Sequence, residues 1–147
     1  MKKSRTRYPR AANPRRVGKF PAAVFSGGGY VWDEVLEYRV WCHSNDGDDY
    51  YFAFATYPKA LAFSRRTEGA EEPLALIRQR QHINEPEPGK YVHVKKSRLT
   101  EWPVDFLSRP RRTPRTIPDF LAPDAPANRL DIIRGLAKAP TKRKAKA

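Results

Sequence analysis

Hydrophobic and polar residues alternate through the middle of the chain in a pattern typical of two half-buried strands. In an extended chain over residues 34–42, one face would carry Leu36, Tyr38, Val40 and Cys42. A loop rich in Asp, Asn and Gly follows, and residues 50–56 then form an aromatic stretch with the composition of a second strand. We therefore expect residues 34–42 and 50–56 to pair as an antiparallel hairpin.

The hydrophobic period changes to that of a helix after the second strand. Thr56 is suited to cap a helix, Pro58 fits its first turn, and Gly69 marks its end. Two further strands are expected at residues 74–83 and 91–99, joined by a turn rich in proline and glycine.

This order of elements predicts an α+β fold: a small, mostly antiparallel sheet (β-β-α-β-β) with one packed helix. The helix would place Leu61 and Phe63 against the sheet residues Leu36, Tyr38, Phe52, Phe54, Leu74 and Leu76. We expect a compact domain over residues 30–107. Residues 1–29 would be a disordered basic arm, and residues 108–147 a basic proline-rich extension with a short helix near residues 128–137.

Positive charge is concentrated at the two ends of the sequence. Residues 1–19 and 108–147 each carry a net charge of +8, and residues 20–107 carry −3, which gives the total of +13. Such a distribution favours a polyanionic partner, because each Lys or Arg that neutralises a phosphate releases counterions. An acidic protein surface is an alternative partner for the same cations. The candidate nucleic-acid contacts are Lys2, Lys3, Arg5, Arg7, Arg10, Arg15, Arg16, Lys19, Arg109, Arg111, Arg112, Arg115, Lys142, Arg143, Lys144 and Lys146.

A second basic surface is an alternative, on the two strands expected at residues 74–83 and 91–99. There, cations would interleave with Tyr91 and His93 and hold a single strand by stacking, or would simply form the solvated face of the sheet. These cations are Arg78, Arg80, Lys95, Lys96 and Arg98. The triplet Gly27–Gly29 is expected to be a flexible linker, because no basic or hydroxyl residue lies at the spacing of a phosphate-binding P-loop.

Neither a catalytic site nor a metal site is expected. The acidic loop at residues 46–49 lacks the calcium-binding pattern, and the acidic cluster at residues 68–72 is typical of an exposed turn. Cys42 and His43 are adjacent in a strand and should face opposite sides, which disfavours a shared metal or a Cys–His nucleophile pair. One cysteine allows no internal disulfide, and no apolar run has the length of a membrane span or the form of a signal peptide. We expect a cytoplasmic location.

Several segments resemble a small family of uncharacterised alphaproteobacterial proteins. They are residues 35–43, 50–57, 69–76, 85–89 and 100–103. Members of that family often carry the label of GNAT-type N-acetyltransferase, so the resemblance implies acetyl-CoA as cofactor and an amine substrate. The GNAT cofactor loop is Gln/Arg-x-x-Gly-x-Gly/Ala. Here Val24 stands three residues before Gly27, so the resemblance assigns no cofactor-binding residue.

The hypothesis that best fits the sequence is a small, non-enzymatic bacterial accessory protein that binds nucleic acid or a nucleoprotein through its cationic ends. Two alternatives stay open. One is a GNAT-like N-acetyltransferase that uses acetyl-CoA, and the other is a protein-interaction adaptor.

Overall fold

The computed structural model of the protein describes residues 8–140, in which strands and helices are mixed. This confirms the α+β class predicted from the sequence. In chain order the elements are η1 (Pro14–Arg16), β1 (Phe25–Ser26), β2 (Glu34–His43), β3 (Asp49–Phe54), α1 (Tyr57–Arg66), β4 (Leu74–Gln79), β5 (His82–Glu87), β6 (Lys90–Val94), β7 (Arg98–Pro103), η2 (Val104–Ser108), α2 (Thr116–Leu121) and α3 (Arg129–Ile133).

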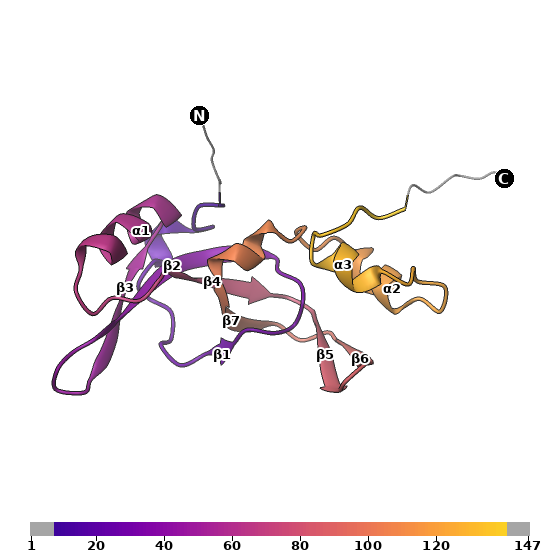
Figure 1. Ribbon diagram of the computed structural model, residues 1–147, viewed down its shortest axis with the longest axis horizontal. Helices are drawn as coiled ribbons and strands as arrows, with labels where there is room; N and C mark the ends of the chain where they lie inside the picture. Colours follow the sequence, from indigo (N-terminus) through magenta and orange to yellow (C-terminus); the bar gives the residue numbers. More distant parts are fainter. Residues whose placement is uncertain (1–7, 141–147) are drawn as a thin grey trace.

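Five strands form the main sheet in the order β1-β7-β4-β2-β3, and all neighbours are antiparallel except β1 and β7. The predicted hairpin of the first two long strands is confirmed, with Tyr38 opposite Phe54. The single strands expected at residues 74–83 and 91–99 are each divided in two. The strand expected at residues 74–83 becomes β4 and the start of β5, and the strand expected at residues 91–99 becomes β6 and the start of β7. Strands β4 and β7 pair in the main sheet. Strands β5 and β6 form a separate hairpin, which projects from the main sheet (Figure 1).

Helix α1 forms where the sequence predicts it and packs over β2 and β3 (Figure 1). The hydroxyl of Thr56 accepts a hydrogen bond from the amide of Lys59 at 3.4 Å, so this threonine is the N-cap. The Phe63 ring lies 4.9 Å from Phe52 and 5.3 Å from Phe54, between ring centroids. The expected contact of Phe63 with the hairpin is therefore confirmed.

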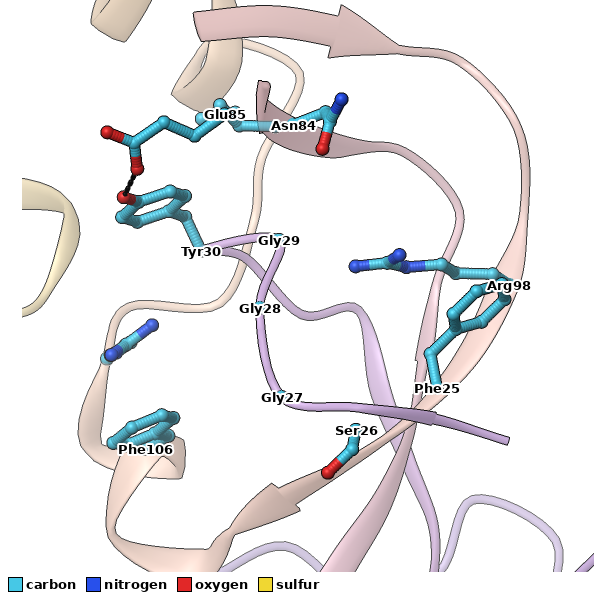
Figure 2. Close-up of a pocket in the computed structure, with 12 residues that line it drawn as sticks. Phe25, Ser26, Gly27, Gly28, Gly29, Tyr30, Asn84, Glu85, Arg98 and Phe106 are labelled. Atoms are coloured by element: carbon cyan, nitrogen blue, oxygen red, sulfur yellow. Dashed lines mark hydrogen bonds between the residues drawn. The ribbon is translucent and has the colours of Figure 1, made fainter. Parts of the chain in front are cut away.

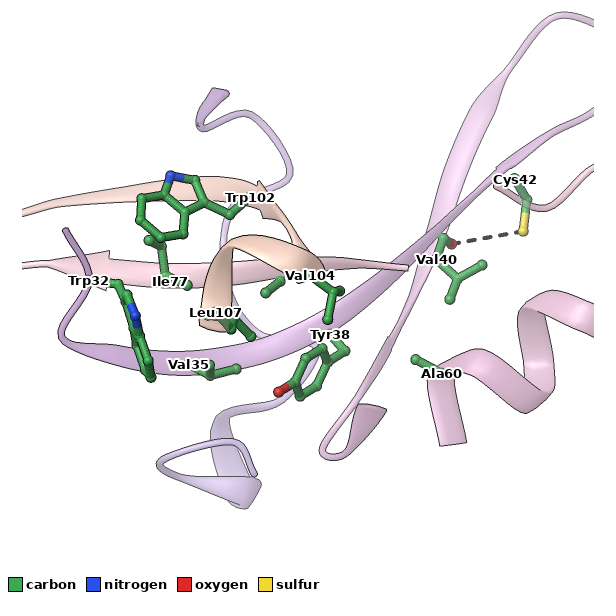
Figure 3. Packing of buried hydrophobic residues seen from close by; sticks show 11 residues of the cluster. Trp32, Val35, Tyr38, Val40, Cys42, Ala60, Ile77, Trp102, Val104 and Leu107 are labelled. Carbon is green, nitrogen blue, oxygen red and sulfur yellow. Dashed lines mark hydrogen bonds between the residues drawn. The ribbon is translucent and has the colours of Figure 1, made fainter. Parts of the chain in front are cut away.

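The expectation that Leu36 and Leu76 lie under the helix is wrong. A β-bulge between Val35 and Glu37 adds a residue to β2, so that Val35 and Tyr38 share the face that packs against α1 and η2. Figure 3 shows Val35 and Tyr38 in this main core together with Trp102. Leu36 and Leu76 instead pack with Phe20 on the opposite face of the sheet.

Residues 8–29 are folded onto the sheet, which corrects this part of the disordered arm expected over residues 1–29. The amides of Ala11 and Ala12 donate hydrogen bonds of 2.8 Å to the carbonyls of Ala55 and Val35. Phe20 is buried against the sheet, and the Tyr38 hydroxyl donates to the carbonyl of Pro9. The sheet is therefore covered on both faces.

A buried ion network explains why the N-terminal segment packs there. The Arg39 side chain is fully buried and forms ion pairs of 2.8 Å with both Glu37 and Glu101. Its guanidinium also donates to the carbonyls of Pro21 and Ala22, so the segment supplies acceptors that water would otherwise provide. Glu37 and Arg39 alternate with apolar residues as on a solvated face, but their side chains are buried because they neutralise each other.

Residues 108–140 also pack on the domain, rather than forming the expected basic extension. Ile117 and Phe120 of α2 and Ile133 of α3 build a second core with Val31 and Ile83. The helix predicted near residues 128–137 exists but spans only Arg129–Ile133. Residues 1–7 and 141–147, with the candidate contacts Lys2, Lys3, Arg5, Arg7, Lys142, Arg143, Lys144 and Lys146, lie outside the described residues.

Candidate anion-binding pocket

A loop of unusual backbone conformation lies between β1 and β2. Residues Gly27, Gly28, Gly29 and Tyr30 all have positive φ, at +66°, +83°, +86° and +66°. Tyr30 is the only non-glycine residue with positive φ in residues 8–140, and an L side chain in this region costs about 1–2 kcal/mol. Strain of this kind persists only where the surroundings impose it, and it concentrates at binding and catalytic sites.

The surrounding residues hold the glycine loop through its carbonyl oxygens. The carbonyl of Gly28 accepts hydrogen bonds of 3.0 Å from both Trp102 Nε1 and Gln79 Nε2. The carbonyl of Gly29 accepts from the amides of Val31 at 2.8 Å and Ile83 at 3.1 Å. Since Trp102 and Gln79 are fully buried, the loop has a rigid support.

Three of the four amide groups of the same loop are unpaired among the described residues, because only the Gly27 amide donates, to the carbonyl of Glu101. In a planar peptide unit the N–H points opposite to the C=O, so the Gly29 amide points away from Trp102 and Gln79. Within the described residues, the amides of Gly28, Gly29 and Tyr30 donate no hydrogen bond. Unpaired backbone donors of this kind are available to an anion.

This loop forms one wall of a pocket of about 420 Å³, a volume within the range of small-ligand sites (Figure 2). The other walls come from β1, from the start of β5, from the start of β7 and from the end of η2. Their residues are Phe25, Ser26, Ile83, Asn84, Glu85, Arg98, Phe106 and Arg109.

Arg98 lies directly against the glycine loop, and Figure 2 shows its guanidinium pointing toward Gly29. A Cβ added at Gly29 would lie 2.9 Å from Arg98 Nη2, so only glycine leaves room for this contact. Arg98 Nε donates to Gln79 Oε1 at 2.7 Å, and the guanidinium lies 5.0 Å from the centre of the Phe25 ring. Burial lowers the pKa of Arg98, but an arginine stays protonated at neutral pH.

Arg109 supplies a second guanidinium to the pocket. It lies 4.0 Å from the centre of the Phe106 ring and 5.1 Å from that of Trp102, which hold it by cation–π contacts. Burial and the nearby charge of Arg134 lower its pKa. Neither Arg98 nor Arg109 forms an ion pair with any residue in the part of the chain that the structure describes.

Glu85 is the only carboxylate that lines the pocket, and its two oxygens are already engaged. One accepts from the Tyr30 hydroxyl at 2.5 Å and the other from the Gly89 amide at 2.8 Å, and these bonds lower the pKa of Glu85. Burial and the bond to Glu85 raise the pKa of Tyr30 to about 12, so its hydroxyl is a neutral donor. Glu85 thus holds Tyr30 in its strained conformation, and the lining keeps an excess of positive charge.

The pocket is therefore suited to bind a phosphate or another compact anion. Guanidinium groups donate in a planar fork that matches phosphate oxygens, and unpaired amides add neutral donors. The chemistry that the two guanidinium groups and the unpaired amides offer is the binding of an anion.

Among the predicted basic contacts that the structure describes, only Arg109 lies in this pocket. Arg112 pairs with Asp33 at 2.8 Å and Arg115 with Asp119 at 2.9 Å, so neither is free for a phosphate. Arg111 lies over the Trp32 ring. Four exposed basic residues of the N-terminal segment form no ion pair among residues 8–140: Arg10, Arg15, Arg16 and Lys19.

The alternative basic sheet surface is not formed. Arg78 and Arg80 both pair with Glu34. Tyr91 and His93 lie on the β5–β6 hairpin rather than on the sheet, and Lys95 and Lys96 belong to the loop that leads to β7. From this set of residues, Arg98 alone lines the pocket.

The other chemical candidates do not come together. Cys42 is buried, and burial raises the pKa of its thiol. The exposed His43 lies on the other side of β2, where Glu71 and Asp49 bond its ring nitrogens. Across the described residues, no three His, Cys, Asp or Glu side chains are grouped as metal ligands.

Interpreting the glycine triplet as a linker missed the site. The run of three glycines was a visible signal in the sequence. However, the two arginines of the pocket lie about 70 and 80 residues further along the chain. No local spacing connects them, because the pairing of β1 with β7 is what brings Arg98 to the loop.

Comparison with known proteins found no match of this chain to a family model, a curated protein or a solved structure. The resemblance to GNAT-labelled proteins therefore stays a prediction. None of the helices in residues 8–140 is long and apolar enough to cross a membrane.

Proposed function

We propose that the protein binds nucleic acid and holds a backbone phosphate in the pocket between the glycine loop, Arg98 and Arg109. The observation that carries the proposal is a pair of arginines, without carboxylate partners among residues 8–140, beside unpaired amides in one pocket. Rigid guanidinium groups and backbone amides recognise phosphate without regard to base sequence.

Further cations beside the pocket favour a polymer over a single small anion. Lys95 and Lys96 precede Arg98 by three and two residues and are exposed, and Arg134 is close enough to lower the pKa of Arg109. Flanking phosphates of a chain would contact these side chains. The basic residues predicted as contacts in residues 1–7 and 141–147 would add non-specific electrostatic attraction. This contribution of the cationic ends lies outside the described residues.

The proposal is tested by fluorescence anisotropy with a labelled oligonucleotide and a double variant, Arg98→Gln with Arg109→Gln. Hydrogen bonds to charged groups contribute about 1.5–3 kcal/mol each, so loss of both arginines should weaken binding by about a hundredfold or more. The slope of log affinity against log salt should also become shallower by about one to two units.

Arg65→Gln with Arg66→Gln is the matched control. These exposed residues end α1, which covers β2 and β3 at the far side of the sheet from β1 (Figure 1). The change in net charge is the same, so this variant should bind within about threefold of the wild type. Equal losses in both variants would show that diffuse charge rather than the pocket binds the ligand.

Coenzyme A carries a pyrophosphate, so the same pocket chemistry allows a test of the acetyltransferase alternative. Acetyl-CoA that stabilises the protein in a thermal melt, and that loses this effect in the Arg98/Arg109 double variant, would favour that alternative. Binding of the oligonucleotide without any effect of acetyl-CoA is the result that our proposal expects.

A further inference from the structure

We infer that Phe25 makes the pocket selective for unpaired nucleotides, an inference that rests on the proposed function. Phe25 is the most exposed aromatic side chain among the described residues, with 61% of its surface accessible. It lies at the rim of the pocket, on a strand that forms one edge of the sheet. An exposed aromatic ring beside a cationic pocket offers a face on which a base can stack.

The ring is held in place although it is exposed. Phe25 lies opposite Thr100 in the pairing of β1 with β7. Two residues further on, the amide of Gly27 donates a hydrogen bond of 2.8 Å to the carbonyl of Glu101. The Arg98 guanidinium lies 5.0 Å from the ring centre. A rigid aromatic platform loses little conformational freedom when a ligand stacks on it.

Arg98 connects this ring with the phosphate site. The same guanidinium lies against Phe25 and against Gly29, as Figure 2 shows. A nucleotide whose phosphate contacts Arg98 and the glycine loop therefore brings its own base, or that of its neighbour, to the Phe25 ring. Base–aromatic stacking together with arginine contacts is the usual way in which single strands are bound without sequence preference.

Stacking on Phe25 requires an unpaired base. Inside a duplex both faces of each base are covered by neighbouring pairs, so a duplex can offer its phosphates to the pocket but no base to the ring. In this inference the arginines bind phosphate, and Phe25 discriminates between single and double strands.

The experiment compares a labelled single-stranded oligonucleotide with the same sequence annealed to its complement. We measure both affinities for the wild type, Phe25→Leu, Phe25→Trp and the control Phe52→Leu, which removes another half-exposed ring on β3 at the opposite edge of the sheet. Phe25→Leu should lose roughly tenfold in single-strand affinity and keep its duplex affinity, as expected when one stacked base is lost. Phe25→Trp and Phe52→Leu should keep the preference for the single strand.

The outcomes separate this inference from the function on which it rests. If the wild type binds both forms equally and Phe25→Leu changes neither affinity, the inference is wrong and phosphate binding stands. If Phe25→Leu weakens both forms alike, the ring supports the pocket and does not discriminate between strands. Absence of binding to either form by the wild type overturns both.

Discussion

The substitution Gly29→Ala tests whether the glycine loop is built as tightly as the structure indicates. The new Cβ would lie 2.4 Å from Gln79 Nε2 and 2.9 Å from Arg98 Nη2. Gln79 cannot move freely, because its amide nitrogen donates to the carbonyls of Gly28 and Val31 and its oxygen accepts from Arg98. The nitrogen and the oxygen of the Gln79 side-chain amide are thus both held by hydrogen bonds, so the amide cannot move away from the new methyl group.

Two costs add in this variant. A non-glycine residue in the left-handed region costs about 1–2 kcal/mol, and overpacking of a buried site costs typically about 1–3 kcal/mol. We therefore expect Gly29→Ala to lower the free energy of unfolding by about 2–5 kcal/mol. Affinity for the oligonucleotide should fall as well, since the Arg98 guanidinium would be displaced.

Gly27→Ala, in the same loop, separates these two costs. Its φ is +66°, and nothing lies within 4 Å of the position of an added Cβ, so only the backbone cost of about 1–2 kcal/mol applies. The entropy that glycine gives the unfolded chain is lost in both variants and cancels in the comparison.

Urea denaturation followed by far-UV circular dichroism measures the difference. With a slope of about 1–3 kcal/mol per molar urea, the midpoint of Gly29→Ala should lie roughly 1 M below that of Gly27→Ala. Equal midpoints for the two variants would refute the close packing of Gln79 and Arg98 on Gly29.

Two other sites give predictions of stability. Arg39→Met should lower the free energy of unfolding by about 3–5 kcal/mol in the same urea assay, because it leaves Glu37 buried without its partner; a loss below about 1 kcal/mol would contradict the buried network. Hydrogen bonds to Glu71 and Asp49 raise the pKa of His43, so its stabilising charge is fully present below pH 6.5 and is lost as the pH rises through the folded-state pKa. The melting-temperature difference between the wild type and His43→Gln should shrink from pH 6 to pH 9, and a constant difference would show that His43 does not titrate with folding.

Local patterns predicted the elements that local interactions determine. The alternation before Cys42 and the capping threonine at residue 56 identify β2 and α1, because strand faces and helix termini depend on neighbours within a few residues. The burial of the second sheet face was missed, since Glu37 and Arg39 have the polarity of a solvated face. Arg39 also pairs with Glu101, more than 60 residues away, and Glu37 and Arg39 bond residues 18–22, which no local pattern indicates.

The candidate site was missed for the same physical reason. A glycine run has the same composition in a flexible linker and in a strained loop, and only the hydrogen bonds from Trp102 and Gln79 distinguish the two. Charge at the ends of the sequence predicts a polyanionic partner, and this stays a prediction. It did not indicate that Arg112 would be neutralised by Asp33 whereas Arg109 would stay available.

An NMR titration of the ¹⁵N-labelled protein with a single-stranded oligonucleotide tests the central claim most directly. The account predicts saturable shifts of the Gly28, Gly29 and Tyr30 amide resonances and of the Nε resonances of Arg98 and Arg109. Shifts confined to other basic segments, such as residues 10–19, with the glycine-loop amides unmoved at saturation, would contradict it.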